Sequence, residues 1–518
     1  MVRVQAFTAL LTLPVAFGLA VHTAKTISPS IPTTAAPGHQ TLDANFLSYS
    51  IEFSYMLDYA GNNSHPNKLS KQLLENLHDV SGAYPIIRAG GTTSNRAVFV
   101  ANQSEALIEK FSSSDSDQPK SLSIGPAWTE AFQQFPKGTK YIYGLNFNDG
   151  ESGLEQTVLE AAAAYKAIGG DIYAFEIGNE VDGFQCSSRR SCSWTIASYA
   201  DQFKKYAAAI VNQSLGDGAK HGKEPLFQGC AFQAPRHLGF NETPFWNVEN
   251  ALERGMDSTG MLKTVADHDY MGSACGGATD ATIEHNLLNH HHMTSLMYYH
   301  EYLGNYTASK GVPYVLGETN SISCQGLANV SDVYAAALWS VDYTLYAASL
   351  NISRIYYHMG TPYRYSAWQP VQSDETAAHV KPLYYGNLFA AAALSGGNKQ
   401  VSVLVNETSL AAYGIYDTKS GSKTSLKSVA IVNLDVWNST QPAAERPYTA
   451  FKLPNHTFSG ASVKRLTSPG VEIAGDITFA GQSVDDNGSM VGKQKVETLS
   501  HGEVLVGAGE AVLVTLSH

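Results

Sequence analysis

Residues 173–180 read Tyr-Ala-Phe-Glu-Ile-Gly-Asn-Glu, an apolar run that ends at a glycine and is followed by Asn179 and Glu180. Short apolar runs of this kind are typical of buried parallel strands, and polar residues directly after them lie at the C-terminal end of the strand. Residues 312–320, Val-Pro-Tyr-Val-Leu-Gly-Glu-Thr-Asn, have the same form and carry Glu318. The chain therefore has two predicted strands that each end in a glutamate.

Further stretches of this kind lie on both sides of these two. The predicted strands cover residues 46–53, 85–91, 141–145, 173–180, 227–232, a run ending at 267–270, 312–320 and 354–358. Helical patterns separate them at residues 68–77, 153–167, 194–211, 282–302 and 333–350. Strands that alternate with helices at this spacing predict an α/β fold, a (β/α)8 TIM barrel, whose active residues gather at the C-terminal strand ends.

The last part of the chain has a different pattern. A chain of 518 residues is too long for one ordinary core. Beyond about residue 396, short alternating runs separated by turn residues cover residues 401–405, 410–416, 428–434, 448–453, 462–466, 496–499 and 510–516. This pattern predicts a catalytic barrel over residues 40–395 and an antiparallel β-sandwich over residues 396–518, with residues 21–39 as a candidate edge strand.

Two strand-end glutamates at one rim of a barrel are the groups that acid-catalysed glycoside cleavage needs. One carboxyl group protonates the leaving oxygen while the other attacks or stabilises the sugar carbon. We therefore predict that the barrel holds Glu180 and Glu318 facing each other.

The N-terminus indicates where the protein works. Residues 1–20 read as a signal peptide, because Arg3 precedes an apolar core and Gly18-Leu19-Ala20 offers small residues for cleavage. The apolar run is short for a bilayer span, so we expect a secreted, extracellular protein with no membrane partner. The net charge of −12 and the lack of a basic stripe argue against a nucleic-acid partner.

Many Asn-x-Ser/Thr tripeptides support the same localisation, because such sites receive glycans in the secretory pathway. The candidate glycosylation sites are Asn62, Asn102, Asn212, Asn241, Asn305, Asn329, Asn351, Asn406, Asn438, Asn455 and Asn487.

The five cysteines do not form the framework of a disulfide-rich fold, since their number is odd and the chain is long. Cys186 and Cys192 flank a short loop, so we expect them to pair, and Cys230 lies in an apolar run and is expected to be a buried thiol. No Cys/His pattern has metal-ligand spacing, and residues 290–292, His-His-His, are predicted on a helix surface. We therefore expect neither a metal ion nor another cofactor.

Gly178-Asn179-Glu180 with the later Gly317-Glu318 resembles the motifs of retaining glycosidases whose catalytic glutamates follow the fourth and seventh barrel strands. The whole chain, barrel and sandwich, more closely resembles glycoside hydrolase family 79, the β-glucuronidase and heparanase group, and in it the fungal and bacterial exo-β-glucuronidases. The resemblance implies that Glu180 is the acid/base and Glu318 the nucleophile. It also implies that Asn179 contacts the 2-hydroxyl group of the sugar.

Other residues match the parts of this family that recognise glucuronate. Cys324-Gln325-Gly326 resembles the loop whose backbone amides hold the uronate carboxylate, although the family can carry tyrosine at the position of Cys324. His358 and Tyr365 resemble the pair that closes over the same carboxylate.

Three more side chains complete the predicted site. Tyr270 resembles the tyrosine that supports the nucleophile, and Glu52 resembles a glutamate that hydrogen-bonds sugar hydroxyls. Arg88 is expected to orient carboxylates beside the site without touching the substrate.

The resemblance implies an exo-glycosidase that releases terminal β-linked glucuronic acid, with or without a 4-O-methyl group, from glycans or glycosides by double displacement. With a net charge of −12, the protein would bind the carboxylate through oriented N–H groups and a hydroxyl, which suits one terminal uronate better than a long sulfated chain. Two alternatives remain open: a retaining exo-glycosidase for a neutral β-linked sugar, and a non-catalytic secreted carbohydrate-binding protein.

Overall fold

The computed structural model describes residues 23–36, 38, 40–112, 118–215, 225–233, 237–242, 245–373, 376–419 and 423–517. The predicted signal peptide, residues 1–20, lies outside the described residues. Among the helices within these ranges, none is both long and apolar enough to cross a membrane.

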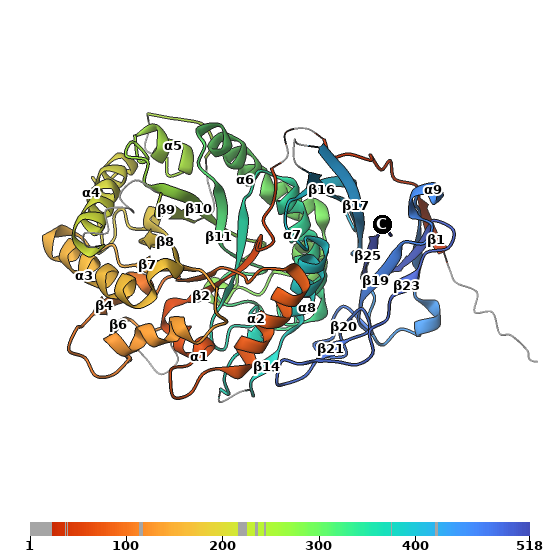
Figure 1. The fold of residues 1–518 in the computed structure, drawn as a ribbon, viewed down its shortest axis with the longest axis horizontal. Coiled ribbons are helices and arrows are strands. Elements are labelled where there is room, and N and C mark those ends of the chain that lie inside the picture. The colour runs from red at the N-terminus through yellow and green to blue at the C-terminus, as the bar shows by residue number, and fades with distance from the viewer. Residues whose placement is uncertain are drawn as a thin grey trace, which may run out of the picture.

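The larger part of the molecule is a closed barrel of parallel strands, on the left of Figure 1. Its strands are β2 (Leu47–Glu52), β3 (Ile87–Gly90), β7 (Tyr141–Leu145), β8 (Ile172–Ile177), β9 (Phe227–Phe232), β10 (Leu262–Tyr270), β11 (Tyr314–Asn320) and β12 (Arg354–Met359). Each strand pairs with the next in this order, and β12 pairs with β2 to close the ring. The predicted TIM barrel is confirmed, and the predicted strands at residues 141–145 and 227–232 have the observed bounds.

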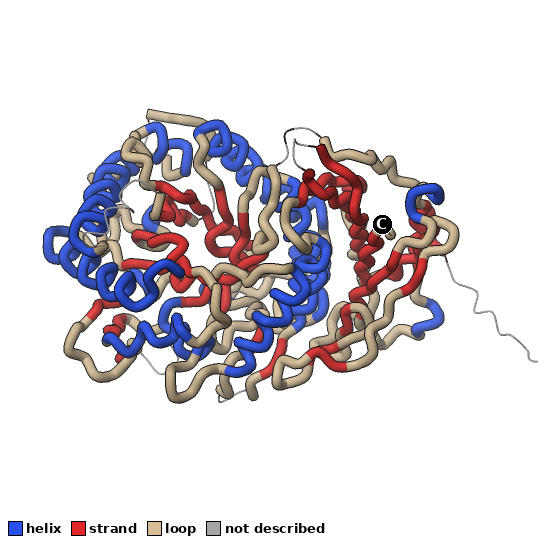
Figure 2. Tube along the Cα trace, viewed as in Figure 1, coloured by secondary structure: helices blue, strands red, loops and turns tan. Residues whose placement is uncertain are grey.

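Helices surround this ring, as the blue segments in Figure 2 show. They are α2 (Lys68–Ser81), α3 (Gly150–Ile168), α4 (Ile196–Ser214), α6 (His290–Lys310), α7 (Tyr334–Ser349) and α8 (Pro382–Ala393), with the short helices α1 (Met56–Ala60) and α5 (Val248–Glu253) between them. The helix expected at residues 282–302 is interrupted: a π-helical turn covers Ile283–Leu287, and α6 starts after Asn289, whose side chain accepts a hydrogen bond from the His292 N–H.

A small sheet that the sequence pattern did not indicate is inserted after β3. Its strands are β4 (Ala97–Phe99), β5 (Leu107–Lys110) and β6 (Ser121–Ile124), in the order β4-β6-β5. Gln118, just before β6, donates hydrogen bonds toward Glu52 and Tyr363. The insertion therefore contributes a side chain to the rim of the barrel.

The C-terminal part consists of two packed sheets, as expected. One sheet contains β15 (Lys399–Glu407), β16 (Leu410–Lys419), β17 (Lys423–Asn433), β25 (Glu510–Thr515), β19 (Ser462–Thr467) and β20 (Thr478–Phe479), with β23 (Glu497–Thr498) beside β19. The other contains β1 (Thr23–Ile27), β18 (Tyr448–Lys452) and β24 (Glu503–Gly507), in which β1 lies at the edge and pairs in parallel with β18. The remaining short elements are β13 (Trp368–Gln369), β14 (His379–Val380), β21 (Ser483–Val484), β22 (Met490–Val491) and α9 (Asn455–Phe458).

The larger sheet is buried on both faces, which joins the two parts of the molecule. Along β17, Val429 and Ile431 pack in the core between the two sheets, whereas Ala430 and Val432 belong to the core shared with the barrel. Side chains alternate across a strand, so one strand serves both cores. Helix α7 is buried on nearly all sides because it lies between the barrel and this sheet.

The prediction that the His290–His292 run lies on the surface is wrong for His290. His290 is buried, and its Nδ1 lies 2.8 Å from Oδ2 of Asp342 on α7. Tyr413 on β16 donates a hydrogen bond to the same carboxylate. The sandwich covers this end of α6, so the burial of His290 depends on the packing of two regions far apart in the sequence.

Candidate active site

A cavity of about 560 Å³ opens at the C-terminal ends of the barrel strands. Its lining residues come from many strand ends and the loops that follow them: Glu52, Thr92, Gln118, Glu180, Gln233, His268, Asp269, Tyr270, Gly272, Cys275, Glu318, Ser323, Cys324, Gln325, His358, Tyr363 and Tyr365. This is the position at which barrel enzymes carry their active sites.

Glu180 projects into the cavity because the backbone turns sharply after β8. Gly178 has φ of 80°, and a Cβ there would lie 2.7 Å from Cγ1 of Val181. Glu180 itself has φ of 50°, in the left-handed region that non-glycine residues seldom adopt. Its Oε1 lies 3.0 Å from Nδ1 of His268, and its Oε2 accepts a hydrogen bond from Nε2 of Gln233 at 3.3 Å.

Glu318 lies within β11 and is held more firmly. Its Oε2 accepts a hydrogen bond from Nη1 of Arg88 at 2.9 Å, and its Oε1 accepts one from the Tyr270 hydroxyl at 2.8 Å. Nδ1 of His358 lies 3.7 Å from Oε2. Both carboxylate oxygens therefore have donors, and the plane of the carboxylate is fixed.

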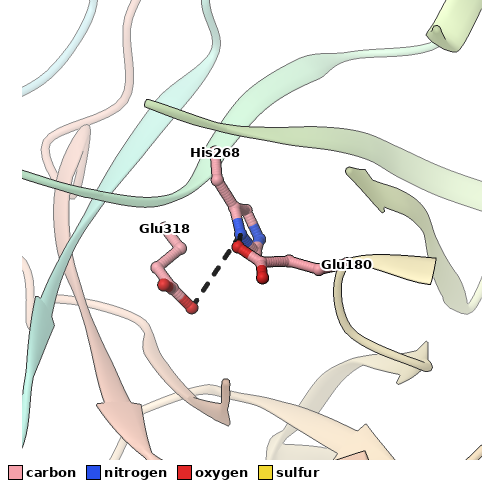
Figure 3. Close-up of side chains that lie close together, drawn as sticks. All are labelled: Glu180, His268 and Glu318. Atoms are coloured by element: carbon pink, nitrogen blue, oxygen red, sulfur yellow. Dashed lines mark hydrogen bonds and ion pairs between the residues drawn. The ribbon is translucent and has the colours of Figure 1, made fainter. Parts of the chain in front are cut away.

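The two glutamates face each other across the cavity, with the imidazole of His268 beside them (Figure 3). One oxygen of Glu180 lies within 4.8 Å of one oxygen of Glu318. Inverting glycosidases separate their carboxyl groups by about 6.5–9.5 Å to leave room for a water molecule, whereas retaining enzymes hold them about 5–5.5 Å apart. The arrangement has the shorter of the two spacings.

Arg88 is a buried cation that binds two carboxylates beside the cavity. Its side chain is fully buried, and Nε and Nη2 donate to the carboxylate of Glu176 while Nη1 donates to Glu318. Nη2 also donates to Oδ1 of Asn179 at 2.7 Å. A planar guanidinium can serve several acceptors at fixed angles, so Arg88 aligns both carboxylates. The expected role of Arg88 is in agreement with these contacts.

The charges around Glu318 favour its ionised form. Burial alone raises the pKa of the Glu318 carboxyl group. The neighbouring His358, His268 and Arg88 side chains act in the opposite direction. Together with the hydrogen bond from Tyr270, they hold the pKa of Glu318 well below its usual range. Glu318 is therefore held as a carboxylate at neutral pH.

His268 is a site residue that the sequence analysis did not single out. It is buried on β10, and its Nδ1 lies 3.0 Å from Glu180 and 4.0 Å from Glu318. Burial lowers the pKa of His268, but the two glutamates raise it above the ordinary value of histidine. A signal was present in the sequence, because His268 is two residues from Tyr270 and alternate residues of a strand share a face.

Glu52 lies at the far side of His358 from the glutamate pair. Its Oε1 accepts hydrogen bonds from the N–H and hydroxyl of Thr93, and Oε2 lies 3.4 Å from Nε2 of His358. Gly91 leaves room for this carboxylate, because a Cβ there would lie 2.7 Å from Oε2 of Glu52. Glu52 is thus a fixed hydrogen-bond acceptor in the lining of the cavity.

The structure brings most of the predicted site residues to the cavity. Those that line it are Glu52, Glu180, Tyr270, Glu318, Cys324, Gln325, His358 and Tyr365. Asn179 and Gly326 are not among the lining residues: Asn179 is buried next to Arg88, and Gly326 lies behind the loop, against Ser331 and Tyr365. Their predicted contacts with substrate stay predictions.

Cys186 is bonded to Cys192, the pair named from the sequence, and Cys230 is a buried thiol. A second disulfide joins Cys275 to Cys324 at the cavity, and the sequence analysis did not anticipate it.

The candidate glycosylation sites are all exposed or half-buried.

Glu180, His268 and Glu318 also place three potential metal ligands within 4.8 Å of one another. The oxygens of Glu318 already accept hydrogen bonds from Arg88 and Tyr270, so the guanidinium supplies the positive charge that a cation would bring. Two carboxyl groups at this distance have the arrangement that proton transfer and nucleophilic attack at a glycosidic bond require.

Comparisons with known proteins show which family the chain belongs to. Residues 412–513 match the model described as the glycosyl hydrolase family 79 C-terminal beta domain. A β-glucuronidase of Aspergillus niger is 34% identical over 513 residues, which cover 94% of this chain and 91% of the relative. A β-glucuronidase of Neurospora crassa is 35% identical over 376 residues, which cover 70% of this chain and 65% of the relative.

Solved structures show the same architecture. A 4-O-α-L-rhamnosyl-β-D-glucuronidase from Fusarium oxysporum superimposes with a TM-score of 0.78 at 25% identity, over 95% of this chain and 100% of its own. A family 51 arabinofuranosidase from Xanthomonas axonopodis pv. citri has a TM-score of 0.58 at 11% identity, over 93% of this chain and 98% of its own, and shares the fold alone. Given the similarity to the Aspergillus niger relative over nearly the whole chain, the chain belongs to glycoside hydrolase family 79.

Proposed function

We propose that this protein is a secreted β-glucuronidase that releases terminal β-linked glucuronic acid from glycans or glycosides with retention of configuration. The observation that carries the proposal is the pair Glu180 and Glu318, whose carboxylate oxygens approach within 4.8 Å at the rim of the cavity. The names of the two fungal relatives support the choice of glucuronate as the sugar.

The reaction would proceed in two displacements. Glu318 attacks the anomeric carbon while Glu180 donates a proton to the glycosidic oxygen, so the C–O bond breaks as the glycosyl–Glu318 bond forms. The aglycone then leaves. Glu180, now a carboxylate, takes a proton from water, and the oxygen of that water displaces Glu318 from the anomeric carbon. Each step inverts the carbon, so the released sugar keeps the β configuration.

The lining of the cavity determines by which groups a uronate carboxylate would be bound. Among the described lining residues none is lysine or arginine, so a carboxylate there would rely on N–H groups, hydroxyls and imidazoles. Gln325, His358 and Tyr365 all line the cavity: the rings of His358 and Tyr365 lie 6.3 Å apart, and the Tyr365 N–H donates to the Gln325 carbonyl. A long sulfated chain would need a basic cleft, which argues for a single terminal sugar.

Gln118, Glu52 and Tyr363 form the end of the cavity that we expect to accommodate a substituent at the 4-position of the sugar. Gln118 donates hydrogen bonds toward Glu52 and to the Tyr363 hydroxyl, at 3.4 and 3.2 Å. With the anomeric carbon at Glu318 and the sugar over His358, these residues would lie near the hydroxyls opposite the anomeric carbon. We expect a 4-O-methyl group to reach this end of the cavity and to displace only the weak contacts of Gln118.

The decisive assay compares p-nitrophenyl β-D-glucuronide with the β-glucoside, β-galactoside and β-xyloside, so that only the sugar varies. We expect a preference for the glucuronide of at least roughly 100-fold in kcat/KM, since a lost partner of a charged group costs about 1.5–3 kcal/mol per hydrogen bond. A preference for a neutral sugar would reject the uronate site and keep the two-glutamate mechanism. Binding of all four without turnover would favour a carbohydrate-binding protein.

Configuration is tested separately by proton NMR during the first turnovers of the glucuronide. The β-anomer of glucuronic acid should form first and then mutarotate, whereas initial α-anomer would contradict the retaining mechanism.

Secretion and glycan attachment rest on the signal-like N-terminus and the exposed Asn-x-Ser/Thr sites. Expression of the full chain in a fungal host, with the medium and cells assayed before and after deglycosylation, tests both.

A further inference from the structure

The loops that follow β10 and β11 are joined side by side at the cavity. The Ser323 N–H donates to the Gly272 carbonyl at 2.9 Å, and the Ala274 N–H donates to the Ser323 carbonyl at 3.1 Å. The disulfide between Cys275 and Cys324 follows directly after these bonds. The parallel pairing of the two strands is thus extended into their loops and ends in a covalent bond.

The backbone after this bond has an unusual conformation. Cys324, Gln325 and Gly326 have φ values of 58°, 73° and 87°, so three successive residues lie in the left-handed region. Two of them carry side chains, for which this region is costly. Such conformations persist only where the surroundings hold them, and they cluster at functional sites.

Hydrogen bonds hold the other side of the same turn. The Gln325 carbonyl accepts from the Arg364 N–H at 2.7 Å and from the Tyr365 N–H at 3.4 Å, and the Gly326 N–H donates to the Ile322 carbonyl. The disulfide and these bonds therefore fix the turn from both ends.

Two peptide N–H groups of this turn are left for a ligand. Within the described part of the chain, no acceptor is found for the N–H of Cys324 or of Gln325, whereas those of Ser323 and Gly326 are satisfied. Both Cys324 and Gln325 line the cavity. Successive N–H groups in a turn of this kind form a concave donor site for an anion.

We propose that the Cys275–Cys324 disulfide is a positioning element for substrate recognition, which keeps the left-handed turn at Cys324 and Gln325 in the shape that offers two N–H groups to the carboxylate of the sugar. This inference rests on the proposed function. It does not involve the chemical step, because Arg88 and Tyr270 hold Glu318 without any contribution from the disulfide.

The chain contains a matched control. The Cys186–Cys192 disulfide also lies in a loop after a barrel strand, β8, but neither cysteine lines the cavity. We would compare Cys275→Ser/Cys324→Ser with Cys186→Ser/Cys192→Ser and the wild-type protein, using p-nitrophenyl β-D-glucuronide for kcat and KM and free D-glucuronate as a competitive inhibitor.

The expected result is a specific loss of affinity. In Cys275→Ser/Cys324→Ser, KM for the glucuronide and the inhibition constant of D-glucuronate should rise roughly 10- to 100-fold, as expected for weakened hydrogen bonds to a charged group. The value of kcat should stay within about threefold, because Glu180 and Glu318 are untouched. The control variant should keep both constants within about twofold. Since KM and the inhibition constant do not depend on the fraction of folded enzyme, partial misfolding would not imitate this pattern.

A second measurement tests the inference even if Cys275→Ser/Cys324→Ser does not fold. In Cys186→Ser/Cys192→Ser the bond between the exposed residues Cys275 and Cys324 is the remaining disulfide of the described residues, and dithiothreitol can reduce it to two thiols while the reagent is oxidised. KM should then rise on reduction and return on reoxidation.

Three outcomes would overturn the inference. One is an unchanged KM in both experiments, and another is a loss confined to kcat. The third is an equal rise of KM for the glucuronide and the neutral β-glucoside, which would mean that the bond has only a structural role. If the wild-type enzyme itself does not prefer the glucuronide, the proposed function fails first, and this inference fails with it.

Discussion

The two catalytic candidates, Glu180 and Glu318, have the same side chain and opposite surroundings. The side chain of Glu180 is 27% exposed, and its recorded contacts are with His268 and Gln233. The side chain of Glu318 is 10% exposed and accepts hydrogen bonds from Arg88 and Tyr270. One carboxyl group is partly open to solvent, while the other is buried and held by two donors.

This difference supports the proposed roles of the two glutamates without reference to any relative. A nucleophile must be ionised and aimed at one carbon, which buried cationic and hydroxyl donors provide. An acid/base must gain and lose a proton in each cycle, which requires access to water and few fixed donors. The backbone differs as well, since Glu318 lies within β11, whereas Glu180 follows β8 in a turn and has a φ of 50°.

The largest expected effect comes from removing the nucleophile. We expect Glu318→Gln to lower kcat for p-nitrophenyl β-D-glucuronide by a factor on the order of 10⁴ or more, because no other group near the anomeric carbon can form the covalent intermediate. The amide keeps the size of the side chain and an oxygen that can accept from Arg88, so the fold should survive. Activity measurements are paired with a thermal melt of the same preparation. A folded variant that retains most of its activity would show that another residue is the nucleophile.

A smaller effect that depends on the leaving group is expected for Glu180→Gln. For methyl β-D-glucuronide, whose aglycone must be protonated to leave, kcat/KM should fall by about 10²–10⁴. For p-nitrophenyl β-D-glucuronide the same constant should fall much less, because p-nitrophenolate leaves without a proton. Glu318→Gln serves as the control, since it should reduce both substrates alike. Equal losses for both substrates in Glu180→Gln would contradict its assignment as the acid.

The difference between Glu180 and Glu318 could be predicted from the sequence only in part. The positions of Glu180 and Glu318 were predictable because the signal is local: an apolar strand, a glycine and a carboxylate at the strand end, repeated at the spacing of a barrel. Their different environments were harder to foresee. Arg88 was recognised as a group that orients carboxylates, but the choice of Glu318 over Glu180 as its partner depends on the order of strands around the ring.

Features that arise from packing between distant segments were missed. The Cys275–Cys324 bond joins loops 49 residues apart, and it follows from the adjacency of β10 and β11 and not from any cysteine spacing. Gln118 enters the cavity from an insertion whose short strands carry no strong pattern. His290 is buried where β16 of the sandwich brings Tyr413 to the Asp342 carboxylate. Local patterns therefore indicate the catalytic groups, whereas specificity and domain packing depend on tertiary contacts.

The smallest effect is expected for Tyr270→Phe. This variant tests one of the contacts that distinguish Glu318 from Glu180. The Tyr270 hydroxyl donates to Oε1 of Glu318 at 2.8 Å, and a hydrogen bond to the ionised form lowers the pKa of a carboxyl group. Without the hydroxyl the pKa of Glu318 rises, so more of the nucleophile is protonated at low pH. The acidic limb of the kcat/KM profile should therefore move to higher pH, and kcat at its optimum should fall roughly 10-fold.

Tyr314→Phe is the matched control for this experiment. Tyr314 is also buried on the barrel, its hydroxyl donates to Oδ2 of Asp267 at 2.9 Å, and it does not line the cavity. Loss of that hydroxyl can lower the melting temperature as much as Tyr270→Phe does, yet it should leave the acidic limb where it is in the wild-type enzyme. If both variants shift the limb, or neither does, the hydrogen bond from Tyr270 is not what keeps Glu318 ionised, and Arg88 and the two histidines must account for the difference between the glutamates.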